Sequence, residues 1–105
     1  MLTQIATGTS NIASTFSFSS NVILDEVRLH LSAAGGANNL TITIDDNDGA
    51  VYDLVLVTQD MTSVINYQYL PTRPIHLNAD DKLIIAWTNG SSRTYGLKIL
   101  YRPTV

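Results

Sequence analysis

Cysteine is absent from the sequence, and charged side chains are scarce. The absence of cysteine excludes a disulfide framework, thiol catalysis and cysteine-ligated zinc, and it fits synthesis in a reducing cytoplasm. Asp, Glu, Lys and Arg make up 14% of the 105 residues, against about a quarter in a typical soluble domain. A chain this short has much surface for its volume. Its low charge therefore predicts that part of the surface faces protein instead of water.

Charge is missing altogether from the first 24 residues, and the first charged side chain is that of Asp25. Eleven of these 24 residues are Ser, Thr or Asn. Such a tract would favour disorder if it held no apolar residues, but Ile5, Ile12 and Phe16 interrupt it. We therefore expect residues 14–24 to belong to the folded domain. Residues 1–13 are expected to form a contact arm that orders against a neighbouring molecule.

The charges that are present argue against several kinds of partner. Nine acidic and six basic residues give a net charge of −3, and the basic residues are scattered along the chain. Nucleic acids and anionic membrane surfaces attract a basic stripe or cluster, so neither is an expected partner. No apolar run approaches the ~20 residues that cross a bilayer. The length predicts a single domain over residues 1–105.

Apolar and polar residues alternate at every second position along much of the chain, and no segment has a helical stripe. About eight strands at spacings of roughly 8–12 residues are typical of an all-β sandwich or barrel. We predict an antiparallel β-sandwich with jelly-roll connections over residues 14–101. The expected strands lie within residues 14–20, 27–31, 40–44, 51–58, 64–69, 75–77, 82–88 and 94–101.

Residues 45–49, with the sequence Asp-Asp-Asn-Asp-Gly, separate two apolar runs and predict a hairpin turn. A two-residue turn would place Ile44 opposite Asp53, which wastes the apolar face. A three-residue loop, Asn47 to Gly49, instead places Ile44 opposite Tyr52 and keeps the apolar residues of both strands on one face. We predict the three-residue loop, which also pairs Asp46 with Ala50, Ile42 with Leu54 and Leu40 with Leu56.

Three segments place apolar side chains on both faces of their strand, namely residues 22–24, 54–57 and 83–87. One face of each sheet in a two-layer sandwich normally meets solvent, so these segments need a second cover. The cover is either the chain itself, through its N-terminal segment and its longer connections, or another subunit. The sequence favours neither alternative.

Residues that perform catalysis or bind metals elsewhere are present without a recognisable arrangement. The carboxylate pairs Asp25-Glu26 and Asp80-Asp81 are adjacent in sequence, so their side chains point to opposite faces of a strand or lie in turns. His30 and His76 lack the spacing of a zinc site. We predict no catalytic residue, metal, cofactor or small-molecule substrate.

The segment at residues 45–49 also has some likeness to a calcium-binding loop. The EF-hand pattern would require its first ligand at Ile44 and its closing glutamate at Val55. Both positions hold apolar residues, and we favour a hairpin turn with solvated carboxylates.

Several aromatic residues lie in the expected strands, and rings in strands either fill a core or form a platform that stacks on sugars. We favour the core, because aromatic residues are enriched in strands in any case. The residues concerned are Tyr67, Tyr69, Trp87, Tyr95 and Tyr101.

The segment PIHLNADDKLIIAWTN at 74–89, followed by YGLKILY at 95–101, resembles the end of small β-sandwich virion proteins of tailed bacteriophages. VRLHLS at 27–32 and NLTITIDDNDGAVYDLVL at 39–56 are similar to the preceding portion of such proteins. The resemblance implies a head decoration or cement protein that clamps capsid subunits from outside. It implies the major capsid protein and copies of the chain itself, as a dimer or trimer, as partners.

The sequence-based hypothesis is therefore a non-enzymatic virion structural protein, made in the host cytoplasm and located on the capsid surface. The alternative is a carbohydrate-binding or adhesin module of a phage tail. An enzyme is not expected. The residues expected to contact neighbours are Met1, Leu2, Ile5, Ile12, Tyr67 and Tyr69.

Overall fold

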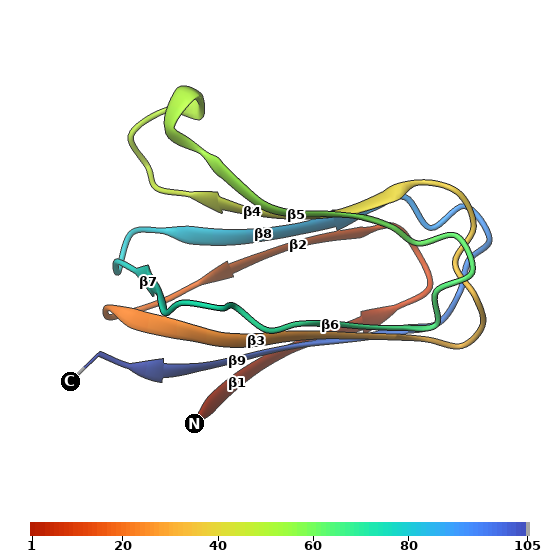
Figure 1. The fold of residues 1–105 in the computed structure, drawn as a ribbon, viewed down its shortest axis with the longest axis horizontal. Coiled ribbons are helices and arrows are strands. Elements are labelled where there is room, and N and C mark those ends of the chain that lie inside the picture. Colours follow the sequence, from red (N-terminus) through yellow and green to blue (C-terminus); the bar gives the residue numbers. More distant parts are fainter. Residues whose placement is uncertain (105) are drawn as a thin grey trace.

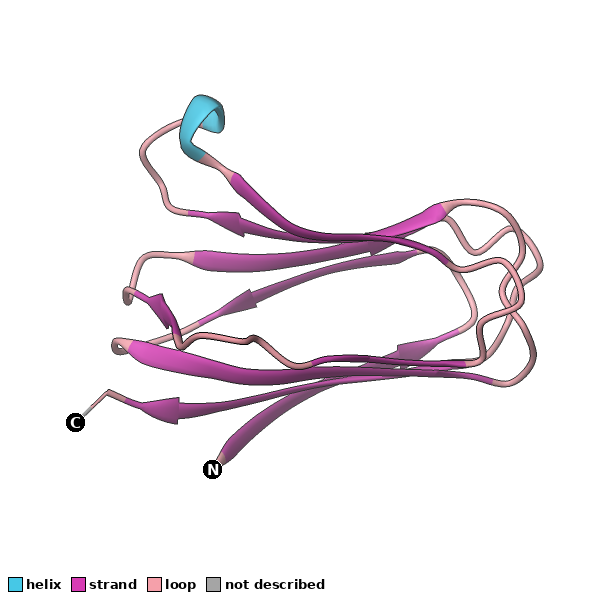
Figure 2. Cartoon of the chain, in the orientation of Figure 1, coloured by secondary structure: helices cyan, strands magenta, loops and turns pink. Residues whose placement is uncertain are grey.

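A computed structural model describes residues 1–104, which fold into two facing antiparallel sheets (Figure 1). The predicted all-β sandwich is confirmed. One short 3-10 helix lies at the end of a projecting hairpin (Figure 2). Among the described residues, no helix has the length and apolar character to span a membrane. The elements are β1 Leu2–Gly8, β2 Ile12–Ser17, β3 Val22–Leu31, β4 Asn39–Asp45, η1 Ala50–Tyr52, β5 Leu54–Asp60, β6 Asn66–Tyr69, β7 Ile75–Leu77, β8 Lys82–Trp87 and β9 Tyr95–Pro103.

The strand order makes the sandwich a jelly roll. One sheet has the order β1-β9-β3-β6, with β7 also paired to β3, and the other has the order β2-β8-β4-β5. The chain is thus one long ribbon, in which β1 pairs with β9, β2 with β8, β3 with β6 and β7, and β4 with β5. The ribbon turns back between β4 and β5 and wraps around both sheets. β6 and β7 are separated by a connection with Pro71 and Pro74, which have no N–H to donate to a ladder.

The core lies between the sheets and is built from the inward positions of the alternating strands. Leu29 of β3, Ile42 of β4 and Ile85 of β8 are each 2% exposed or less. Burial of apolar surface at about 25 cal/mol per Å² is the main force that holds the two sheets together. Most strands therefore have a second, outer face that is not packed in this core. β3 differs over residues 22–24, where the chain buries both faces.

The prediction that residues 1–13 form a contact arm outside the sandwich is wrong. Residues 2–8 form β1, an edge strand that pairs with β9 along its whole length, from Leu2 opposite Tyr101 to Gly8 opposite Tyr95. The N–H and C=O groups of an extended segment need partners, and β9 supplies them within the same chain. The sandwich accordingly begins at β1 and not at residue 14.

The predicted register of the β4–β5 hairpin is also wrong. Ile44 lies opposite Leu54 and Leu40 opposite Gln59, with a bulge between Ile42 and Thr43. The connection is longer than three residues because local hydrogen bonds stabilise it. Carboxylates of residues 45 and 46 accept the N–H groups two positions on, at 3.0 and 3.1 Å. The N–H of residue 52 donates to the carbonyl of residue 49 at 3.0 Å in the 3-10 turn.

Candidate functional site

The outer face of the four-stranded sheet carries two complete rows of side chains without a charge. The alternation that turns Leu40, Ile42 and Ile44 inward turns the neighbouring threonines of β4 outward. Cross-strand register aligns these with small or β-branched residues of β2, β8 and β5. We call these eight residues the uncharged face: Ala13, Thr15, Thr41, Thr43, Val55, Thr58, Ile84 and Ala86.

The uncharged face is suited to contact with another protein surface. Its central side chains, such as Thr43 and Ile84, are half-buried by their neighbours. At one end it is bounded by Lys82 opposite Asp45. A partner covering the rows between would desolvate no ionised group, which is the costly part of burying a polar surface.

The hairpin between β4 and β5 projects beyond this sheet on the side of the uncharged face (Figure 1). We call residues 45–55 the tip. Its apolar side chains lie in solvent, with Val51 86% and Tyr52 64% exposed. Leu54 and Val55 are more than half exposed as well. Leu56 and Val57, by contrast, are partly buried against the core. Of the segment 54–57, Leu54 and Val55 are therefore the residues for which the described chain supplies no second cover.

Three carboxylates of the tip lie close together. Oxygen atoms of Asp45, Asp46 and Asp53 are all within 4.8 Å of one another. Partial burial raises the pKa of Asp53, and the charges of Asp45 and Asp46 raise it further. One oxygen of Asp53 is buried without a hydrogen-bond partner.

This cluster has the ligand chemistry of a hard cation such as Ca²⁺. However, Asp45 and Asp46 already cap the turn through their hydrogen bonds to backbone N–H groups. Their proximity is therefore explained by the turn, and we assign no metal to it.

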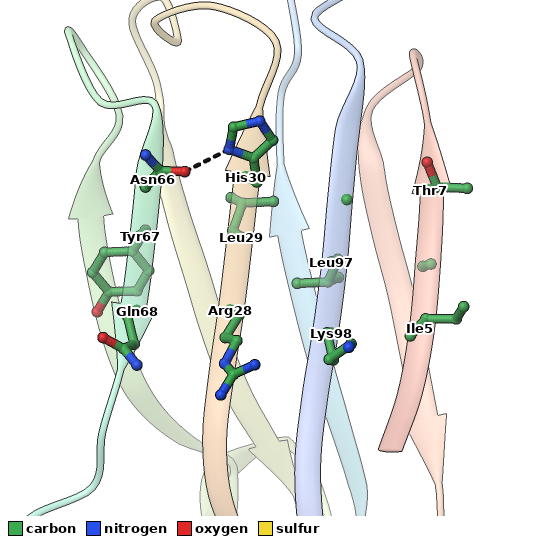
Figure 3. A pocket seen from close by; sticks show the side chains of 12 residues that line it. Ile5, Thr7, Arg28, Leu29, His30, Asn66, Tyr67, Gln68, Leu97 and Lys98 are labelled. Carbon is green, nitrogen blue, oxygen red and sulfur yellow. Dashed lines mark hydrogen bonds between the residues drawn. The ribbon is translucent and has the colours of Figure 1, made fainter.

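The outer face of the five-stranded sheet differs in kind, since it contains an open groove of about 680 Å³. Two cross-strand rows form the groove, and each crosses β1, β9, β3 and β6 (Figure 3). Gly96 lies between Thr7 and His30 in one row, and because it has no side chain the sheet is hollowed there. The other row consists of Ile5, Lys98, Arg28 and Gln68.

Positive charge gathers in the groove. Arg28 and Lys98 are directly opposite each other on neighbouring strands, an arrangement that repels. Glu26, 9% exposed, neutralises one of them by binding Arg28, and it also accepts a hydrogen bond from Gln68 at 2.6 Å. The hydrogen bonds from Arg28 and Gln68 lower the pKa of Glu26, and the same contact raises the pKa of Arg28. Within residues 1–104, Lys98 makes no ion pair.

His30 lies at the rim of the groove, where its Nδ1 is hydrogen-bonded to Oδ1 of Asn66 (Figure 3). The side chain points outward beside Arg28, as the strand alternation predicts. His30 and His76 belong to no cluster of potential metal ligands among the described residues.

The other carboxylate pairs serve the fold. Asp25 sits at a bulge in β3 and forms an ion pair with Arg102 at 3.0 Å. Asp81 accepts the N–H of Asn78 at 2.9 Å and so closes the turn before β8. Asp25 and Glu26 thus bind separate partners, Arg102 and Arg28.

The residues expected to contact neighbours divide into three groups. Met1, Leu2 and Ile5 are exposed, at 77, 48 and 71%. Ile12 is 2% exposed and lies in the core, so its prediction as a contact residue is wrong. Ile12 is the first residue of β2 and points inward, whereas it was assigned from the sequence to the N-terminal arm. Tyr67 and Tyr69 are half-buried and pack against the core.

The aromatic residues of the strands mostly fill the core, as favoured. Trp87 and Tyr95 are 3 and 7% exposed. Tyr101 packs edge-on against Phe18, with ring centroids 5.0 Å apart. The exposed aromatic ring among residues 1–104 is instead Tyr52 of the tip. Its exposure was not predicted from the sequence, because Tyr52 was assigned to a strand. The polar turn directly before it was the signal that this residue lies in a projecting loop.

No protein-family model matches the sequence, and a search of curated proteins found no match. The surfaces of the chain itself are therefore the basis for a functional proposal.

Proposed function

We propose that this chain is a non-enzymatic structural protein of a bacteriophage virion, which binds the outer surface of the capsid and stabilises the shell. The observation that carries the proposal is the uncharged face together with the projecting tip, which exposes Val51 and Tyr52 beside its four aspartates. Both lie on one side of a small sandwich, and neither is covered by the described chain.

The chemistry of this side favours contact with protein. The core of a protein interface is depleted of charged residues and is surrounded by a polar rim. The uncharged face has this composition, and Lys82 and Asp45 lie at its border. The tip adds Val51 and Tyr52 as exposed apolar side chains that a socket in the partner would enclose. Together they form a flat surface with one protruding anchor.

A capsid shell is a suitable partner because its surface presents many copies of the same subunit. A standard interface buries about 800 Å² per partner, and the whole described surface measures 5,947 Å². A small chain therefore has room for few contacts. If copies associate as a dimer or trimer, contacts with neighbouring capsid subunits reinforce one another through a high effective concentration. The resemblance of the segments at 27–32, 39–56, 74–89 and 95–101 to small phage virion proteins supports the same role.

The adhesin alternative has less support. A sugar-stacking platform requires exposed aromatic rings, and those proposed for it contribute to the core instead. No separate observation favours a tail module over a shell protein.

The proposal is tested with heads of the phage whose genome encodes the chain, assembled without it. Purified chain should cosediment with these heads in saturable stoichiometry and raise the temperature at which they release DNA. Bovine serum albumin at equal concentration serves as the control. If the chain stays in the supernatant, or if its gene lies in no phage or prophage genome, the proposal is wrong.

A further inference from the structure

The groove on the five-stranded sheet lies on the opposite side of the sandwich from the uncharged face and the tip (Figures 1 and 3). If the chain binds a shell through the uncharged face and the tip, as proposed above, the groove faces away from the shell. The groove is thus available to a second ligand, and its chemistry can be considered independently of shell binding.

Charge in the groove is opposite in sign to that of the whole chain. The chain has a net charge of −3, yet Arg28 and Lys98 stand side by side in the groove with Glu26 as their only close acidic neighbour among the described residues. Like charges directly opposite on paired strands cost stability. Glu26 neutralises Arg28, and Lys98 makes no ion pair within residues 1–104, so the groove keeps a net positive charge that is complementary to an anion.

The remaining lining indicates what else the ligand offers. Gln68, Asn66 and His30 present planar polar groups along the rows, next to the hollow at Gly96. Apolar residues make up much of the remaining surface, among them Ile5 and Leu97. These donors and acceptors are side chains on the face of the sheet. An extended peptide would instead bind through main-chain hydrogen bonds at a free strand edge. Side-chain groups arrayed across a sheet face suit a ligand with many hydroxyl and carboxylate oxygens.

Among residues 1–104, Tyr67 is the aromatic residue of the groove lining, and its ring is half-buried against the core. Stacking therefore cannot supply the affinity for a neutral sugar, and charge must do so. We propose that the groove binds an acidic saccharide, with a carboxylate of the sugar between Lys98 and Arg28 and a sugar ring over Gly96.

Binding through one open groove is weak, with a dissociation constant of about 0.1–1 mM, or roughly −4 to −5.5 kcal/mol. The probe is galacturonic acid trimer, and its fully methyl-esterified form is the matched control, since it has the same rings without charge. Titration followed by NMR should shift the amide resonances of residues 28–30 and 96–98 with the acid. The ester should bind at least about tenfold more weakly, because a charge-assisted hydrogen bond contributes about 1.5–3 kcal/mol.

Two variants test the location. A side chain at Gly96 meets no atom within 4 Å and needs no unusual backbone angle, so Gly96→Leu should fold normally and block the groove, with loss of detectable binding. Gly90 is equally open but lies outside the groove, and Gly90→Leu should bind like the parent chain. Lys98→Gln, an exposed substitution, should weaken binding about tenfold and keeps the test informative if Gly96→Leu does not fold.

Some outcomes would overturn the proposal. The first is equal binding of the acid and its ester, and the second is unchanged binding by both Gly96→Leu and Lys98→Gln. The third is the absence of any resonance shift at 10 mM acid, a concentration about tenfold above the weakest expected dissociation constant. Tighter binding of citrate than of the trimer would indicate a site for small anions and not for saccharides. Shell binding by Gly96→Leu is measured in parallel, and because the groove is on the other side, it should persist whether or not the saccharide binds.

Discussion

The two outer faces of the sandwich are built on the same plan but differ in what they offer. Each consists of two rows of four residues across four strands. The rows of the four-stranded sheet contain Ala, Thr, Val and Ile alone. Those of the five-stranded sheet contain two cations, a histidine and two amides. Because these outer positions lie outside the core, the fold itself does not require this difference.

The contrast extends to shape. The five-stranded sheet is hollowed at Gly96, while the four-stranded sheet has a side chain at every position of its rows and a protruding tip at one end. A flat surface with an anchor suits a large protein partner, whereas a charged hollow suits a smaller ligand. One small domain can thus be bifunctional without a second core.

The largest expected effect concerns the inner faces, which should not differ between the sheets. Leu29→Ala in the five-stranded sheet and Leu83→Ala in the four-stranded sheet each remove a side chain no more than 2% exposed. Each should lower the free energy of unfolding by about 2–5 kcal/mol, because it leaves a cavity. Urea denaturation measures both. A loss below 1 kcal/mol for either would contradict the shared core.

The next effect should separate the outer faces. Ile84→Lys places a charge in the middle of the uncharged face and should weaken shell binding at least about tenfold, because an unpaired buried charge costs several kcal/mol. Thr3→Lys adds the same charge to the outer side of the five-stranded sheet and should leave shell binding unchanged. Cosedimentation measures both. Equal effects would show that the faces do not differ in this function.

A smaller effect is expected from pH. The pKa of Glu26 is lowered by Arg28 and Gln68, so its carboxylate stabilises the fold above the usual value of about 4.3. This stabilisation is lost as pH falls through the lowered pKa. Glu26→Gln should therefore melt at a lower temperature than the parent chain at pH 7, with a difference that shrinks toward pH 2. Thr43→Val, on the uncharged face, should show no pH-dependent difference.

The smallest effect is expected in the tip. Because burial and the neighbouring carboxylates raise the pKa of Asp53, its charged form costs stability above that pKa. The cost disappears as pH falls below the usual value of about 3.9. Asp53→Asn should slightly raise the melting temperature at pH 7 and have no effect at pH 3. A lower melting temperature at pH 7 would mean that the carboxylate stabilises the turn.

Much of the fold is predictable from alternation alone. Leu40, Ile42 and Ile44 point inward as their spacing predicts, and a strand was predicted for each of β2 to β9. The start of the strand predicted at residues 51–58 is instead a 3-10 turn. β1 was missed because its apolar residues are sparse and its partner, β9, is almost the whole chain away. The hairpin register was missed because hydrogen bonds of Asp45 and Asp46 with the backbone compete with the shortest loop.

The surfaces are less predictable than the strands. The low charge of the chain and of residues 1–24 predicted that part of the surface faces protein, but not that an uncharged face forms on the four-stranded sheet. The groove requires Arg28, Lys98 and Gly96 to meet at a register set by four strands. That register depends on the bulge at Asp25 and on the pairing of β1 with β9, neither of which is a local property of the sequence.

The pairing of β1 with β9 has a mechanical consequence. Leu2 and Tyr101 lie opposite each other at the same end of an antiparallel pair. A force that pulls these two points apart would break the ladder one rung at a time, as in opening a zipper, and would meet little resistance. A force that slides one sheet past the other would have to disrupt the whole interleaved core at once. Such a molecule withstands strain that slides its two sheets past each other far better than strain applied through its two ends.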